Sequence, residues 1–189
     1  ITDSLVGSEM CIRDRRWPHF VKVCKLARDN GAEVKAYILL KPPYLSEKES
    51  IDDAVKSAID AAPHVDKISI NPVNVQKNTV VEKLWFRNEW VAPWLWSVVD
   101  VLKKCEDLPI RVYSDPTGGG TRRGAHNCHD CNKKILQALN NHRLGLGDLK
   151  GLHCNCKSRW DVLVQQSNLR RNGSEPHGYR SGFSGSRHF

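Results

Sequence analysis

Short apolar runs alternate with helical patterns through most of the chain, and this alternation limits the fold more than any other feature. Three runs have the length of strands: 34–40, 67–70 and 110–113. Helical spacing predicts helices over 17–30, after Ser46, after Thr79, after Pro93, after Cys131 and after Cys156. Strands that alternate with helices pair in parallel through right-handed crossovers. The predicted fold class is therefore α/β with parallel strands.

Local patterns fix several details of this prediction. The run 34–40 is nearly continuous, which is typical of a strand buried on both faces. The pairs Ser46/Glu49 and Thr79/Glu82 have the spacing of capping boxes and predict two helix starts. Three strands make a poor open sheet, so we expect its first edge to have been covered by strands that precede this chain.

Charge and cysteine content narrow the functional classes. The 189 residues suit one domain, and the formal net charge of +8 favours an anionic partner, nucleic acid first. The chain has neither an apolar stretch of 18 residues nor a secretory signal, so we expect no membrane partner. Four of the seven cysteines fall in short-spaced pairs, which indicates metal ligation in a reducing cytoplasm.

The two cysteine pairs predict a metal site. Cys128 and Cys131 form a CxxC motif, and Cys154 and Cys156 form a CxC motif. Two such turns can close a tetrahedron of thiolates around one zinc ion. Alternatives are an iron–sulfur cluster or unliganded thiols, and a neighbouring histidine could replace one ligand: His126, His129 or His153.

Polar residues follow each predicted strand, where ligands bind in parallel α/β folds. These strand ends are Lys41, the segment 71–76 and the segment 115–123. Gly118–Gly120 could bring backbone amides close to a phosphate, or form a flexible loop. Lys77, Arg122 and Arg123 are the candidate nucleic-acid contacts. Four tryptophans are expected mainly in the core rather than stacked on bases: Trp85, Trp90, Trp94 and Trp96.

Three segments carry a resemblance to a known family: LKPPYLSEKE (40–49), ISINPVNVQKNTVVEKLW (68–85) and SDPTGGGTRRGAHNC (114–128). Over roughly residues 16–165 the chain resembles the radical SAM subunit of archaeosine synthase, a family of archaeal tRNA modification related to the radical SAM domain of the elongator catalytic subunit. The resemblance implies a partial (βα) barrel that binds S-adenosylmethionine and a [4Fe–4S] cluster. It implies radical cleavage of a lysine adduct on a 7-deazaguanine of tRNA, and a lysine-transferring partner subunit.

The sequence departs from this family in one respect. The cluster motif CxxxCxxC does not occur in it, and we expect that motif upstream of Arg16. The chain would then be the C-terminal half of the barrel and inactive alone. Cys24 and Cys105 lie on predicted helices and are expected to be buried. Five strand-end residues could line the cofactor or substrate pocket, or simply cap loops: Asn71, Asn74, Gln76, Asp115 and Thr117.

Four segments follow from these observations. Residues 1–15 resemble a non-native adaptor, 16–120 form the partial radical SAM barrel, 121–167 a cysteine-rich zinc-binding extension, and 168–189 a disordered basic tail. Two other functions remain compatible with the sequence. One is a non-catalytic, zinc-stabilised RNA-binding module, and the other is a TIM-like half-barrel of unrelated function.

Overall fold

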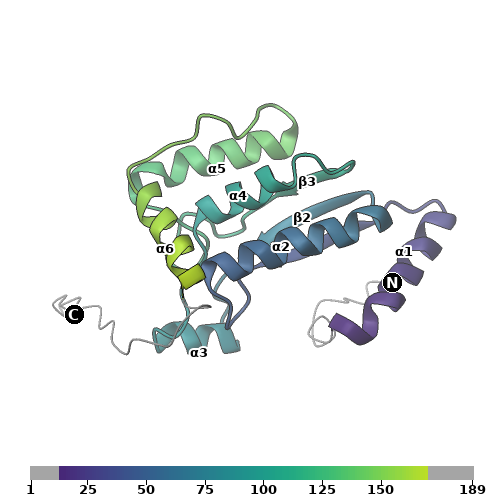
Figure 1. Cartoon of the computed structure of the whole chain (residues 1–189), viewed down its shortest axis with the longest axis horizontal. Coiled ribbons are helices and arrows are strands. Elements are labelled where there is room, and N and C mark those ends of the chain that lie inside the picture. Colours follow the sequence, from purple (N-terminus) through teal and green to yellow (C-terminus); the bar gives the residue numbers. More distant parts are fainter. Residues whose placement is uncertain (1–12, 170–189) are drawn as a thin grey trace.

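The computed structural model describes residues 13–169. Within this range a small sheet is flanked by helices, as Figure 1 shows. The predictions for the adaptor-like segment and for the basic tail lie outside the described residues, apart from the first turn of α1 (Arg13–Asp29) and the end of α6 (Lys157–Leu169).

The sheet has three strands in the order β1 (Lys35–Leu40), β2 (Lys67–Pro72) and β3 (Arg111–Ser114). Both pairings are parallel, with Ile38 opposite Ile70 and Ile70 opposite Ser114. The prediction of an α/β fold with parallel strands is confirmed. All three strands therefore end at the same edge of the sheet, and the loops that follow them share that edge.

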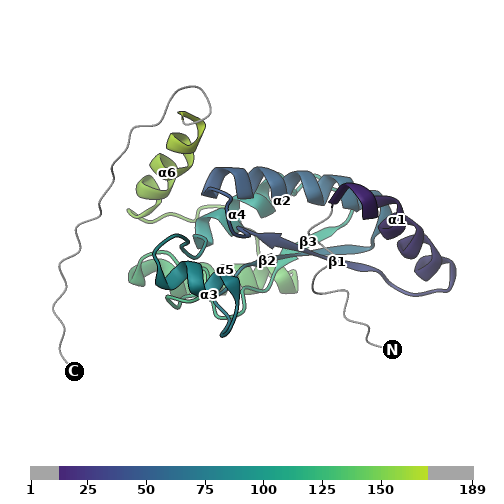
Figure 2. The ribbon, with the colours of Figure 1, turned by 90° about the horizontal axis from the view of Figure 1, so that it is seen from below.

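One face of β1 packs against helices and the other is open. Ile38 and Leu40 are buried, whereas Tyr37 is 53% exposed and Leu39 is 43% exposed. Figure 2 shows α2 (Glu47–Ala61) and α4 (Leu95–Lys104) together on one side of the sheet. The expectation that this strand is buried on both faces is wrong, because among the described residues the helices that pack on β1 cover only one of its faces.

The helices begin largely where the capping residues predict. Ser46 accepts from the backbone N–H of Glu49, and the Glu49 side chain accepts from the N–H of Ser46, so this capping box is confirmed. Thr79 caps α3 (Val80–Phe86) as expected, through the N–H of Glu82. The Glu82 carboxylate, however, accepts from the N–H of Asn78 rather than Thr79, so the second box is wrong in its return bond. Asn78 has a φ of +64°, which turns its N–H toward that carboxylate.

One core joins the elements that cover the sheet. It includes residues from α1, from the strands, from α5 (His129–Leu144) and from α6. The short helix η1 (Ala62–His64) links α2 to β2. Cys24 and Cys105 are buried in this core, as predicted. Trp90 and Trp96 are buried too, which confirms a packing role for these two tryptophans. Within residues 13–169, no helix combines the length and apolar character needed to cross a membrane.

Candidate metal centre and strand-end rim

The four paired cysteines converge on one point. Cys128 Sγ lies 3.6 Å from Cys131 Sγ and 3.6 Å from Cys154 Sγ, and Cys131 Sγ lies 3.6 Å from Cys156 Sγ. All four sulfur atoms lie within 4.8 Å of one another. Zn–S bonds of about 2.3 Å place the sulfurs of a regular tetrahedron about 3.8 Å apart. The quartet therefore has the geometry to hold a metal ion.

Two helix starts supply the four thiols. Cys128 is the N-cap of α5 and Cys131 lies in its first turn, while Cys154 and Cys156 directly precede α6. The N–H of Lys157 donates to the carbonyl of Cys154 at 2.9 Å and begins that helix. The positive ends of two helix dipoles thus point at the same cluster of sulfurs. This arrangement favours thiolates over thiols and hence a cationic metal.

Burial and hydrogen bonding act in opposite directions on the thiols. Burial favours the neutral form of Cys156, but the indole N–H of buried Trp96 donates to its sulfur at 3.4 Å. With the other contacts of the cluster, this hydrogen bond leaves the pKa of Cys156 at about 7. Burial raises the pKa of Cys131. At least one thiolate is therefore accessible near neutral pH, as metal binding requires.

The spacing of the sulfurs fits a single ion better than a cluster. In a [4Fe–4S] cluster each thiolate binds a different iron, so the four sulfurs lie farther apart than around one ion. Among the described residues, the potential ligand group at this point consists of cysteines alone. His126 instead contacts the carbonyl of Gly124 through Nδ1, at 2.8 Å, and His129 is exposed beside Asp130.

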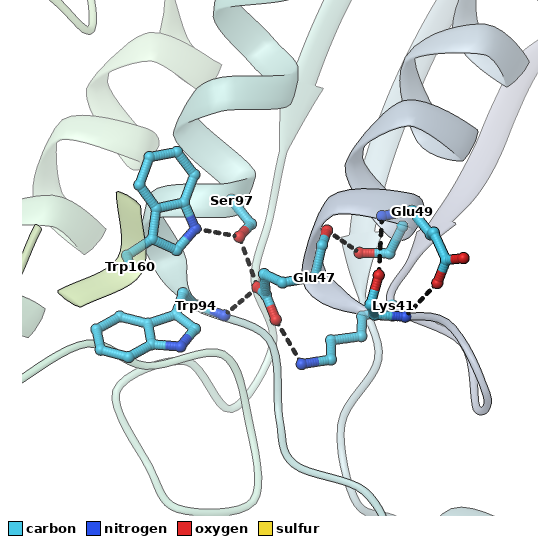
Figure 3. A network of polar contacts seen from close by, with 8 residues as sticks. Lys41, Glu47, Glu49, Trp94, Ser97 and Trp160 are labelled. Atoms are coloured by element: carbon cyan, nitrogen blue, oxygen red, sulfur yellow. Dashed lines mark hydrogen bonds and ion pairs between the residues drawn. The ribbon is translucent and has the colours of Figure 1, made fainter. Parts of the chain in front are cut away.

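A buried polar network ties α6 to the start of α2. Lys41 and Glu47 form an ion pair in which both side chains are almost fully buried. The other oxygen of Glu47 accepts from the backbone N–H of Trp94 and from the Ser97 hydroxyl. Ser97 in turn accepts from the indole N–H of Trp160 at 2.7 Å. Figure 3 shows Lys41, Trp94 and Ser97 around the Glu47 carboxylate, with the Trp160 indole directed at the Ser97 hydroxyl.

The structure brings three of the five predicted pocket residues together. Asn74 donates from Nδ2 to the carbonyl of Thr117 at 3.1 Å, and Gln76 donates to Asn74 Oδ1 at 2.6 Å. The loops after β2 and β3 therefore touch at the carboxyl edge of the sheet. We call this edge, formed by residues 71–76 and 115–123, the rim. Its proposed role in cofactor binding stays a prediction.

The other two pocket candidates lie at adjacent strand ends. Ile70 and Ser114 are register partners, and the Ser114 hydroxyl donates to the carbonyl of Ile70 at 2.7 Å. Asn71 and Asp115 directly follow this pair, so they lie on neighbouring strands of the same edge. Asn71 Oδ1 accepts from the Ser69 hydroxyl at 2.9 Å. Asp115 is exposed.

The triple-glycine loop packs against the protein itself. The N–H of Gly119 donates to the carbonyl of Pro116 at 2.9 Å, and the N–H of Gly120 donates to the carbonyl of Ala125 at 2.8 Å. A Cβ at Gly119 would lie 2.7 Å from a methyl carbon of Leu136. The hypothesis that these two amides are available to a phosphate is therefore wrong. The glycines serve the turn and its close approach to α5.

The three candidate nucleic-acid contacts differ in their surroundings. Lys77 and Arg122 are exposed. Arg123 is half-buried, with its guanidinium 2.9 Å from Glu82 and 5.1 Å from the centre of the Trp85 ring. Its role in RNA binding stays a prediction, but it also holds α3 in place.

Sequence reasoning missed Glu47 and Trp160 as parts of one network. From the sequence, Glu47 is only a residue in the first turn of a helix. Its partner Ser97 lies 50 positions later, and Trp160, which contacts Ser97, lies 63 positions after that. No local pattern joins residues at such separations. An acidic residue at a position of the helix that faces the core is the signal that could have drawn attention to it.

Fold and site together define a class: a parallel α/β protein with four converging cysteines that could hold a metal ion. Within that class, the chain is 40% identical over 152 residues to archaeosine synthase subunit beta of Methanosarcina acetivorans, covering 77% of this chain and 43% of that protein. It is 40% identical over 155 residues to the protein of the same name in Thermococcus kodakarensis, covering 79% of this chain and 48% of that protein.

A third relative is an uncharacterised protein of Methanocaldococcus jannaschii, 32% identical over 154 residues, which cover 78% of this chain and 42% of that protein. The chain thus spans less than half the length of each of these relatives. No protein-family model and no solved structure matches it.

Proposed function

We propose that this chain is part of an archaeosine synthase subunit beta, a radical SAM enzyme that modifies tRNA. The observation that carries the proposal is the 40% identity to two proteins of that name over about 150 residues. The aligned segments make up 77% and 79% of this chain, so they include β2, β3 and the rim wherever they begin. The proposed substrate is tRNA carrying a lysine adduct on a 7-deazaguanine, delivered by a lysine-transferring partner subunit.

The open face of the sheet supports a partial (βα) barrel. Parallel sheets are normally covered on both faces. In a barrel, helices cover the outer face and the inner face lines the lumen. Tyr37 and Leu39 lie on the face of β1 opposite α2, with Ser69 and Asn71 beside them in register. We assign this face to the barrel interior and the rim to the mouth where substrate enters.

The residues of this chain fit some of the expected groups and not others. The cysteine quartet fits one zinc ion, which would fasten α6 to α5. The radical cluster does not fit: the motif CxxxCxxC is absent from the sequence, and the quartet is too tightly spaced for a cluster. S-adenosylmethionine bound to such a cluster supplies a 5′-deoxyadenosyl radical. In this proposal the chain contributes the rim to that chemistry, with Asn71, Asn74, Gln76, Asp115 and Thr117 orienting cofactor or base.

A chimera tests the proposal. The matching segment of Thermococcus kodakarensis archaeosine synthase subunit beta is replaced by residues 16–169 of this chain, in cells that lack the native gene. We expect archaeosine to reappear in tRNA, as measured by mass spectrometry of nucleosides. Asp115→Ala in the chimera should lower the archaeosine content at least several-fold, because that carboxylate is exposed at the predicted mouth. Asp148→Ala, at an exposed site outside the rim, is the matched control.

A chimera that is folded and carries its iron–sulfur cluster but forms no archaeosine would contradict the proposal. Folding is checked by thermal melting, and the cluster by its visible absorbance. A zinc-stabilised RNA-binding module is the second candidate, and the geometry of the cysteine quartet together with the net charge of +8 favours it. Tight tRNA binding by a chimera without archaeosine formation would support that candidate instead.

A further inference from the structure

The segment between β2 and α4 forms a small lobe beside the rim. Residues 73–92, here named the α3 lobe, have a core of their own, built from Val75, Leu84, Trp90 and Ala92. Figure 2 shows α3 on the opposite side of the molecule from α2. The lobe directly follows β2, so it stands at the carboxyl edge of the sheet. It is therefore well placed to meet a large substrate that approaches the rim.

The outer face of α3 combines an aromatic ring with positive charges. Leu84 points into the core of the lobe and is buried. Lys83, Phe86 and Arg87 have the spacing i, i+3 and i+4, so they share one face of the helix. All three are exposed, and Phe86 is 66% exposed. A phenylalanine this accessible contributes little to folding and presents a flat apolar ring to solvent.

The ring is held in place from behind. The rings of Phe86 and Trp85 lie 5.1 Å apart in an edge-on arrangement. The guanidinium of Arg123 lies 5.1 Å from the Trp85 ring centre and 6.0 Å from that of Phe86. Arg123 itself is fixed by Glu82 at 2.9 Å and by the carbonyl of Val75 at 3.3 Å. The aromatic pair is thus preorganised, which lowers the entropic cost of binding a ligand on it.

The charge around the ring identifies the chemistry of the partner. Lys77, Lys83, Arg87 and Arg122 are exposed on the lobe or on the loop that touches it. The lobe also carries two acidic residues: Glu82 is paired with Arg123, and Glu89 is exposed, so the basic groups still outnumber the acidic ones. Exposed aromatic rings bordered by lysine and arginine are the elements that bind single-stranded nucleic acid, since bases stack on the rings and phosphates meet the cations.

We propose that the α3 lobe binds an unpaired base of RNA by stacking on Phe86, with Lys83 and Arg87 contacting the flanking phosphates. The identity of that RNA as tRNA rests on the proposed function. Sequence reasoning placed the tryptophans of this region mainly in the core. Trp90 is buried, as expected. Phe86 is exposed and had been given no role.

Direct binding measurements test the inference with the 189-residue chain. The probes are an unmodified tRNA transcript and a short unstructured RNA. Their binding to the chain is measured by fluorescence anisotropy at several salt concentrations. Phe86→Ala should weaken binding of both by roughly 5- to 150-fold, the range expected for loss of one stacked base. Phe86→Trp should retain binding. The double variant Lys83→Gln/Arg87→Gln should make the negative slope of log K against log salt shallower by about 2.

Matched controls separate a local effect from a general one. Leu146→Ala removes a side chain that is 73% exposed and that follows α5, outside the α3 lobe. Lys103→Gln removes an exposed charge on α4. Neither should change RNA binding. If Phe86→Ala binds tRNA as tightly as the original chain, the inference is overturned and the proposed function stands. If the original chain binds neither RNA, while the chimera forms archaeosine, the inference alone fails.

Discussion

At the scale of single residues, the Glu47 carboxylate organises more of the structure than any pattern in the sequence indicates. It neutralises Lys41, accepts from Trp94 and Ser97, and through Ser97 holds the indole of Trp160. Lys41 has a φ of +60°, a left-handed conformation that is unfavourable for a lysine and is retained by this pairing. Lys41, the first residue after β1, is therefore fixed by Glu47 at the start of α2, which is itself held by Trp94 and Ser97.

Removing this carboxylate should destabilise the protein strongly. Glu47→Ala leaves a buried ammonium without its partner, and we expect the free energy of unfolding to fall by about 3–5 kcal/mol. Glu49→Ala, which removes only the exposed half of the capping box, should cost about 1 kcal/mol or less. Urea denaturation of both variants measures the difference. Equal losses would show that the buried pair contributes no more than the cap.

At the scale of elements, the loops after β2 and β3 are built for close packing. A Cβ at Gly124 would lie 2.2 Å from the carbonyl oxygen of Gly118, so the loop folds back on itself where only a glycine fits. The same loop contacts residues 74 and 75 through Asn74 and through the N–H of Val75, which donates to Arg123 at 2.7 Å. The two loops of the rim thus form one unit.

Gly124→Ala tests how tightly that unit is packed. The methyl group would meet backbone rather than a movable side chain, so we expect a loss of about 2 kcal/mol or more in unfolding free energy. Gly151→Ala is the comparison: its φ of +66° is strained for alanine, but the surrounding space is open. That variant should lose about 1 kcal/mol. Chemical denaturation of both variants measures the two losses in unfolding free energy. A loss for Gly151→Ala as large as that for Gly124→Ala would contradict the packing argument.

The positions of most helix starts and of all three strands were predictable from the sequence. Ser46, Glu49 and Thr79 mark helix starts by local chemistry, and the apolar runs mark all three strands. The exposure of Tyr37 and Leu39 was not predictable, because a continuous apolar run looks the same whether one or both faces of the strand are covered. The hydrogen bond from the Asn78 N–H to the Glu82 carboxylate was not predictable either. It accompanies a left-handed backbone at Asn78 that no sequence pattern indicates.

The candidate site was predictable to a different degree. The convergence of Cys128–Cys131 with Cys154–Cys156 was predicted from their spacing, because two short-spaced cysteine pairs can direct four sulfurs at one metal ion. The rim followed from the rule that parallel strands end at one edge. The engagement of Arg123 by Glu82 and Trp85 did not follow, because it joins segments about 40 positions apart. The use of the glycine amides within their own loop was likewise a matter of tertiary packing.

At the scale of the whole molecule, the metal centre and the Glu47 network hold the same helix at neighbouring points. A metal ion held by the cysteine quartet would fix the start of α6 to the start of α5, and Trp160, one turn later, donates to Ser97. The covering of the sheet by α2 and α4 thus continues into a third helix that packs on α2. Loss of the metal would remove one of these two attachments.

Metal removal should therefore loosen α6 while the sheet survives. We expect one zinc ion per chain by elemental analysis, and a strong chelator should lower the melting temperature and increase hydrogen exchange in α6 and the first turn of α5. Cys156→Ser should reproduce this effect. Cys24→Ala, which alters a core cysteine remote from the quartet, should keep the zinc. Purified chain with full protection of α6 and no bound metal would refute a structural metal.

The order of the strands along the chain has a consequence for how the protein emerges during synthesis. Among the described strands, β2 pairs with β1 and β3 pairs with β2, so the sheet order follows the sequence order. The nascent chain can therefore extend its sheet strand by strand in the direction of translation, without waiting for a distant partner. The four cysteines of the quartet follow β3 in the chain. Metal binding would therefore come late in synthesis and would stabilise a sheet that has already formed.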